Sequence, residues 1–165
     1  MRTYLLDTSA ILAHYLSEEG SAKVQALLDE PAAIVLVAAP VLLELDGSLM
    51  RKGAGEVARH SVVNEYGTRL AETVSVDKEV ALSAVALRKS ASERLPAMGA
   101  LIAGCALANE AVLVHRDPHY DNIPREALET WNILKSGEYP DGSSRPAVVR
   151  ERSSARTRSG RRQKT

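Results

Sequence analysis

The chain has 165 residues, which is enough for one domain with a buried core. Hydrophobic residues make up 45% and charged residues 25%, as in soluble globular proteins, and no apolar run approaches the roughly 18 residues that cross a bilayer. A single cysteine excludes an internal disulfide and fits a reducing compartment, so we expect a cytoplasmic protein.

The net charge of zero conceals an uneven distribution along the chain. Residues 145–165 hold eight of the 21 basic residues and one of the 21 acidic residues, which leaves 13 basic and 20 acidic residues, a net charge of −7, in residues 1–144. Because its end has few apolar side chains, we expect a folded domain over 1–140 and a basic, disordered tail over 141–165. The tail is either an incidental extension or an arm that contacts nucleic acid.

Strand-like and helix-like segments alternate along the chain. Short apolar runs predict strands at residues 4–6, 34–37, 74–76, 111–115 and 131–134. Helical spacing and helix-start signals predict helices at residues 8–16, 21–28, 40–53, 56–71, 78–90 and 100–108. Strands separated by helices imply a parallel sheet between helical layers, so the predicted fold class is α/β, a three-layer α/β/α domain.

Three acidic residues stand out from the surface acids. Asp7 and Asp117 each follow an apolar strand, and Glu44 lies inside an apolar helical segment. Because parallel strands end at one edge of a sheet, Asp7 and Asp117 should meet there. Gathered carboxylates repel unless a cation lies between them, and Mg²⁺ or Mn²⁺ prefers oxygen ligands. The alternative interpretation is a helix N-cap for Asp7 and a partly exposed helix acid for Glu44.

Four stretches of the chain resemble, in order, the acidic blocks of a PIN domain. They are LLDTSA at 5–10, PVLLEL at 40–45, LPAMGALIA at 95–103 and LVHRD at 113–117. More narrowly, the chain resembles the VapC toxins of bacterial toxin–antitoxin pairs, which are small single PIN domains. The resemblance implies an endoribonuclease that depends on Mg²⁺ or Mn²⁺, cuts an RNA substrate, is inhibited by a VapB-like antitoxin and is commonly a homodimer.

The resemblance also implies roles for individual residues. Asp7, Glu44 and Asp117 match the catalytic, metal-holding acids, whereas Gly99 stands where the family has a further acid. Asp121 follows Asp117 by one helical turn and is a candidate replacement ligand. Two explanations are open for Gly99: a naturally degenerate site, or an aspartate replaced by glycine so that a toxic nuclease could be expressed.

Neighbouring polar residues have two interpretations each. The hydroxyls of Thr8 and Ser9 either orient a carboxylate or water, as substrate-side groups, or cap a helix. Arg116 either contacts a substrate phosphate or forms an exposed ion pair. His115 and His119 form an alternative metal pair.

Three functions follow from these patterns. The first is a metal-dependent endoribonuclease toxin whose chemistry is impaired at Gly99. The second is a catalytically degenerate PIN-like module that binds antitoxin or RNA without cleaving it. The third is an unrelated α/β protein whose acids bind Mg²⁺ and a phosphorylated small molecule. Cys105 lies in an apolar helical segment and is expected in the core rather than as a nucleophile.

Overall fold

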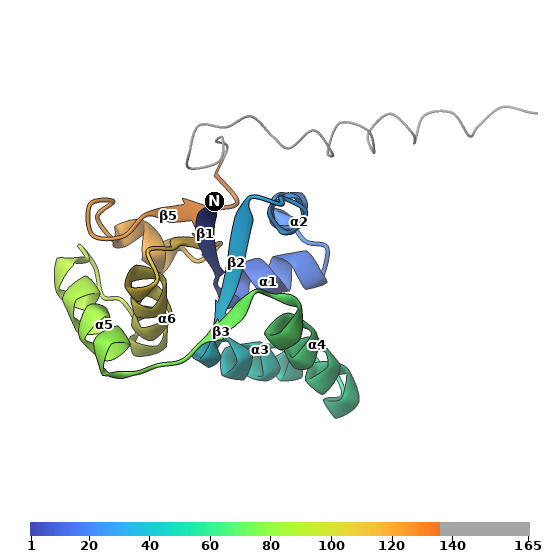
Figure 1. Cartoon of the computed structure of the whole chain (residues 1–165). Helices are drawn as coiled ribbons and strands as arrows, with labels where there is room; N and C mark the ends of the chain where they lie inside the picture. Colours follow the sequence, from blue (N-terminus) through green and yellow to red (C-terminus); the bar gives the residue numbers. More distant parts are fainter. Residues whose placement is uncertain (136–165) are drawn as a thin grey trace, which may run out of the picture.

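The computed structural model describes residues 1–135, and it contains a sheet of five parallel strands (Figure 1). The strands are β1 (Arg2–Leu6), β2 (Ala33–Ala38), β3 (Glu72–Val74), β4 (Val112–His115) and β5 (Thr130–Asn132). Their order in the sheet is β3-β2-β1-β4-β5, so β1 lies at the centre. The predicted domain boundary at 140 and the predicted tail at 141–165 lie outside the described residues.

Helices cover the sheet on both sides. They are α1 (Thr8–Tyr15), α2 (Ser21–Leu28), α3 (Ala39–Arg51), α4 (Glu56–Arg69), α5 (Lys78–Ser90), α6 (Ala97–Ala108) and the short 3-10 helix η1 (Pro118–Asn122). In Figure 1, α1 and α2 lie on one side of the sheet and α5 and α6 on the other. The predicted three-layer α/β/α arrangement with a parallel sheet is therefore confirmed. None of these helices, across residues 1–135, has the length and apolar character needed to cross a membrane.

The register of the central strands brings distant segments together. Leu6 pairs with Val37 of β2 and with Val114 of β4, so these three strands end side by side. Leu5, Leu6 and Val114 are buried completely, which is why this part of the sheet tolerates only apolar side chains. The residues that follow β1, β2 and β4 consequently meet at one edge of the sheet.

Several predicted boundaries differ from the observed ones; the strand expected at 131–134, for example, is observed at Thr130–Asn132. A strand was expected at 74–76, but β3 covers Glu72–Val74, because Ser75 and Val76 lead into the N-cap Asp77 of α5 instead of pairing with β2. The helix expected at 100–108 begins earlier, at Ala97, so that Gly99 lies in the first turn of α6. The short helix η1 was not predicted, because its sequence PHYDN has no apolar spacing.

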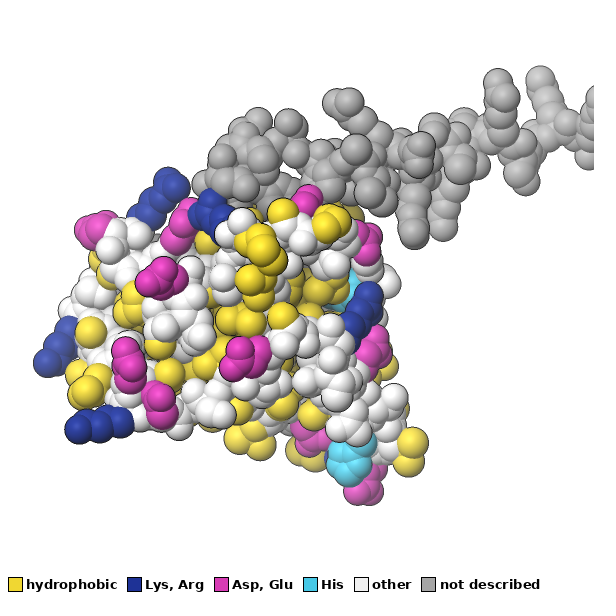
Figure 2. Space-filling view, in the orientation of Figure 1, with side chains coloured by type: hydrophobic (Ala, Val, Ile, Leu, Met, Phe, Trp, Pro, Cys, Tyr) yellow, Lys and Arg dark blue, Asp and Glu magenta, His cyan; other side chains and the backbone are white. Residues whose placement is uncertain are grey.

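The molecular surface mixes side chains of every kind. On the face in Figure 2, apolar, acidic and neutral side chains alternate, and Lys and Arg side chains are scattered toward the margin of the view. Among the residues that the structure describes, this face offers no continuous basic surface of the kind that binds nucleic acid through phosphates.

Close packing of α5 against α6 depends on a glycine. A Cβ atom built on Gly104 would lie 2.7 Å from the carbonyl oxygen of Val80 and 3.1 Å from the amide nitrogen of Ala84. We expect Gly104→Ala to lower the free energy of unfolding by about 1–3 kcal/mol, because the two helices must separate. Urea unfolding monitored by circular dichroism measures this change.

Gly67→Ala in α4 is the matched control, since its Cβ would meet Leu42 at an ordinary 3.7 Å. Alanine favours helix over glycine, so this variant should gain up to about 1 kcal/mol. If both alanine variants changed stability equally, close packing at Gly104 would not be what fixes α5 against α6.

Candidate active site

A cavity of about 270 Å³ lies where β1 and β4 end. Its wall comes from the start of α1, from α3, from the start of α6 and from η1. The lining includes the predicted residues Asp7, Thr8, Ser9, Glu44, Gly99 and Asp117. Segments that are far apart in the sequence thus contribute acidic and hydroxyl side chains to one pocket.

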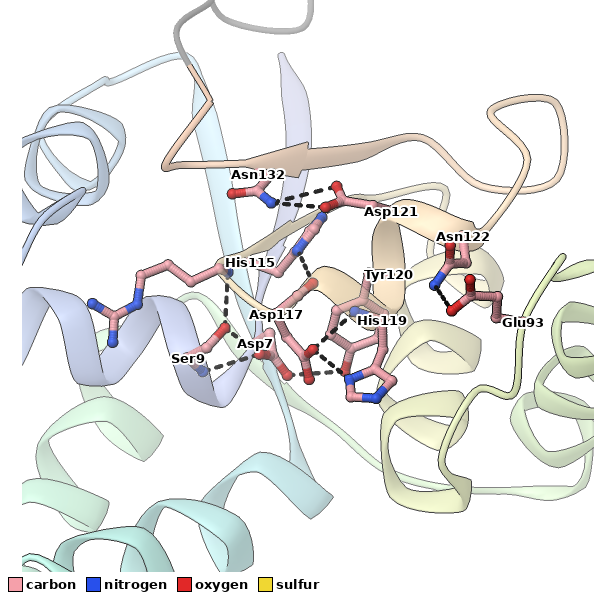
Figure 3. Close-up of polar contacts among 11 residues, drawn as sticks. Asp7, Ser9, Glu93, His115, Asp117, His119, Tyr120, Asp121, Asn122 and Asn132 are labelled. Atoms are coloured by element: carbon pink, nitrogen blue, oxygen red, sulfur yellow. Dashed lines mark hydrogen bonds and ion pairs between the residues drawn. The ribbon is translucent and has the colours of Figure 1, made fainter.

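The Asp7 carboxylate is held in the pocket by Ser9 and Tyr120 (Figure 3). It is 4% exposed and caps α1, with Oδ2 accepting hydrogen bonds from the Ser9 amide at 3.0 Å and the Ser9 hydroxyl at 2.6 Å. Its Oδ1 accepts a bond from the Tyr120 hydroxyl at 3.0 Å. The N-cap interpretation and the pocket position are therefore both correct for Asp7.

The hydroxyls beside Asp7 connect the walls of the pocket. Ser9 Oγ also accepts a hydrogen bond from the Arg116 amide at 2.9 Å, which joins the start of α1 to the end of β4. Thr8 Oγ1 donates to Glu44 Oε2 at 2.8 Å, which joins α1 to α3. Both hydroxyls hold carboxylate-bearing segments in place, as the orienting interpretation predicts.

Glu44 reaches the pocket because β2 continues directly into α3. Burial raises the pKa of the Glu44 carboxyl above its ordinary value, and the negative charges of Asp7 and Asp117 raise it further, while the hydrogen bond from Thr8 lowers it. The three carboxylates therefore interact electrostatically across the pocket. A cation among them would relieve this repulsion.

Asp117 caps η1 and faces the pocket with one oxygen already engaged. Its Oδ1 accepts hydrogen bonds from the His119 amide at 2.9 Å and the His119 Nδ1 at 2.7 Å. Its Oδ2 receives no hydrogen bond from residues 1–135. This oxygen is thus available to a ligand.

Several predicted residues lie outside the pocket. The side chain of Asp121 points to β5, where it accepts a hydrogen bond from Asn132 at 3.1 Å and pairs with Lys135 at 3.1 Å. The structure therefore does not bring Asp121 to the place of a replacement ligand. The guanidinium of Arg116 pairs with Glu18, as its ion-pair interpretation predicts.

The proposed pair of histidines is not formed. His115 is fully buried, and its Nδ1 donates a hydrogen bond to the backbone carbonyl of Asp117 at 2.8 Å. Burial lowers the pKa of His115, so its imidazole is neutral, and its Nε2 has no hydrogen-bond partner in the described part of the chain. Of the two histidines, only His119 lines the pocket, so the alternative metal pair of His115 and His119 is wrong.

Cys105 is buried as expected, and burial raises the pKa of its thiol to about 11.

The oxygen-rich donor set suits a hard divalent cation. Asp7, Glu44 and Asp117 supply carboxylate oxygens, the ligand type that Mg²⁺ and Mn²⁺ prefer. Within residues 1–135, no three His, Cys, Asp or Glu side chains converge closely enough to hold an ion directly. An ion bound here would therefore complete its coordination with water, as Mg²⁺ commonly does.

The sequence patterns do not indicate Tyr120, a buried residue that contacts Asp7. The segment around it, PHYDN, is polar and reads as a surface loop. A tyrosine three residues after a predicted ligand was the one available signal, and no periodic pattern indicated that it points inward.

The raised pKa of Glu44 predicts how stability depends on pH. The folded protein holds a proton on Glu44 at pH values where the unfolded chain has released it, so ionisation disfavours the folded state. In EDTA, the free energy of unfolding should therefore fall as the pH rises from about 4.5 through the raised pKa. Glu44→Gln should remove this part of the decline, as urea unfolding at several pH values would measure.

Glu56→Gln, which alters an exposed carboxyl outside the pocket, is the control for that series. If the free energy of unfolding declined equally steeply with pH in the parent protein and in Glu44→Gln, the pKa of Glu44 would not be raised by its surroundings.

Comparisons with known proteins place the chain in a family. The chain matches the PIN domain model over residues 4–126. A search of curated proteins finds no match. Solved structures share the fold: VapBC2 from Rickettsia felis, bound to a DNA fragment from its promoter, has 21% identity and a TM-score of 0.63, over 79% of this chain and 98% of that chain.

Two further structures are similar. DNA-bound VapBC from Salmonella typhimurium has 18% identity and a TM-score of 0.62, over 81% of this chain and 99% of that chain. VapBC-5 from Mycobacterium tuberculosis has 20% identity and a TM-score of 0.57, over 79% of this chain and 98% of that chain.

These likenesses show a shared fold, and the family match excludes the interpretation as an unrelated α/β protein. Since that match covers about three quarters of the chain, the protein belongs to the PIN domain family, whose members are generally nucleases.

Proposed function

We propose that this protein is a divalent-metal-dependent endoribonuclease and the toxin of a VapBC-type toxin–antitoxin pair. The observation that supports the proposal best is the gathering of Asp7, Glu44 and Asp117, from three distant segments, around one cavity. The similarity to the folds of VapBC complexes supports a VapB-like antitoxin as partner. Homodimer formation and a cytoplasmic location belong to the same proposal.

In the proposed mechanism, Asp7, Glu44 and Asp117 would hold Mg²⁺ or Mn²⁺ through their carboxylate oxygens together with bound water. When bound, such an ion would supply Lewis-acid chemistry, which activates water and neutralises charge on a scissile phosphate. Ser9 and Tyr120 fix Asp7 through their hydrogen bonds, and Thr8 fixes Glu44. The carboxylates are thereby positioned before RNA binds, which lowers the reorganisation that cleavage requires.

Gly99 favours a second candidate function. It lines the pocket without adding a carboxylate, at the position where the resemblance implies an acid. A site with fewer carboxylates binds a divalent cation less tightly. The second candidate is therefore a degenerate PIN-like module that binds antitoxin or RNA without cleaving it.

Cleavage of a structured RNA separates the two candidates. With Mn²⁺ we expect the parent protein to cut, and Asp7→Asn and Asp117→Asn to lower the rate about 100-fold or more, because each variant removes a charged ligand. EDTA should abolish cleavage and excess Mn²⁺ should restore it. Gel analysis of end-labelled RNA measures these rates.

Asp46→Asn is the matched control, because Asp46 lies on α3 near Glu44 but pairs with Arg59 outside the pocket. Its rate should stay within about twofold of the parent rate, as expected for a surface pair. RNA that is bound but never cut, by the parent protein with Mn²⁺ or Mg²⁺, would replace the nuclease proposal with the binding module.

A further inference from the structure

We propose that Tyr120 is a positioning residue of this site: its hydroxyl fills the space beside Gly99 and fixes the carboxylate of Asp7. The inference rests on the proposed function, because it names the residue that orients one of the proposed metal ligands. It also explains how a glycine can line an acidic pocket without leaving that side of the pocket unfilled.

The position of Tyr120 is closely defined. The residue is 2% exposed, and its hydroxyl donates to Asp7 Oδ1 at 3.0 Å (Figure 3). Its ring packs edge-on against His115, with ring centroids 5.1 Å apart. A phenol O–H is a hydrogen-bond donor, which suits the acceptor oxygen of the Asp7 carboxylate.

The hydrogen bonds to Asp7 leave one acceptor position of its carboxylate free for a ligand. A carboxylate offers about four acceptor positions, two on each oxygen. Ser9 takes two of them at Oδ2 through its amide and hydroxyl, and Tyr120 takes one at Oδ1. The remaining acceptor position lies on the oxygen that Tyr120 holds, so the tyrosine decides where that position points.

Gly99 and Tyr120 depend on each other sterically. A Cβ atom at position 99 would lie 3.3 Å from the Tyr120 hydroxyl oxygen and 3.6 Å from the ring atoms Cε1 and Cζ. The first distance is tighter than ordinary contacts, and the buried, hydrogen-bonded phenol has little freedom to move away. A side chain at position 99 should therefore shift the hydroxyl by a few tenths of an ångström and weaken its hydrogen bond to Asp7, whereas phenylalanine at position 120 would leave only ordinary contacts.

The first test is the affinity of the full chain for Mn²⁺, measured by isothermal titration calorimetry. Tyr120→Phe should weaken binding about tenfold, the lower end for loss of a group that orients a metal ligand. Tyr66→Phe is the matched control: Tyr66 is also 2% exposed, but its hydroxyl contacts His14 away from the pocket. The control should bind Mn²⁺ within about twofold of the parent protein, because it leaves the pocket unchanged.

The second test is a thermal double-mutant cycle between positions 99 and 120. Gly99→Ala adds only the Cβ, and its gain in helix propensity is the same in both backgrounds. It should lower the melting temperature when Tyr120 is present and raise it in the Tyr120→Phe background, a difference of about 4 °C or more. In the Tyr66→Phe background, Gly99→Ala should behave as it does in the parent protein.

The outcomes separate the inference from the proposed function. Additive melting temperatures at positions 99 and 120, or unchanged Mn²⁺ affinity in Tyr120→Phe when the parent binds Mn²⁺, would overturn the inference alone. A parent protein that neither binds Mn²⁺ nor cuts RNA would overturn the proposed function, and the thermal cycle would still decide whether Tyr120 fills the Gly99 side.

Discussion

The site depends on the parallel pairing of β1 with β4. Leu6 lies opposite Val114, and the amide of Asp7 donates to the carbonyl of Val114 at 2.9 Å. This register places Asp7 beside the segment that supplies Asp117, while the Ser9 hydroxyl fastens the start of α1 to the amide of Arg116. A shift of the pairing by one residue would point Asp7 to the opposite face of the sheet. The pairing of the buried apolar strands therefore determines that Asp7 lies beside the segment of Asp117.

The gathered carboxylates of the pocket lower the stability of the fold. The Asp7 carboxyl is buried, and Glu44 is partly buried near two other carboxylates; burial and these neighbouring charges raise the pKa of Glu44. Hydrogen bonds from Thr8, Ser9 and Tyr120 compensate part of this cost without removing the charges. Groups held in an unfavourable electrostatic arrangement are common at functional sites, since a ligand that neutralises them gains binding energy.

The sequence predicted the parts of the site that follow from topology. Asp7 and Asp117 were expected at one edge because parallel strands end there, and the structure places both at the same cavity. Asp121 was misplaced because spacing along a short 3-10 helix does not show that its side chain turns to Asn132 and Lys135. Tyr120 was missed because its burial depends on contacts with Asp7 and His115, which lie in distant or non-periodic positions.

The central claim is that Asp7, Glu44 and Asp117 together hold a divalent cation. Crystals of the protein soaked in Mn²⁺ would test it by anomalous scattering at the manganese edge. The account predicts a peak in the cavity, within about 2.5 Å of at least two of these carboxylates, with water completing the coordination. An anomalous peak elsewhere, or none in the cavity at millimolar Mn²⁺, would contradict it.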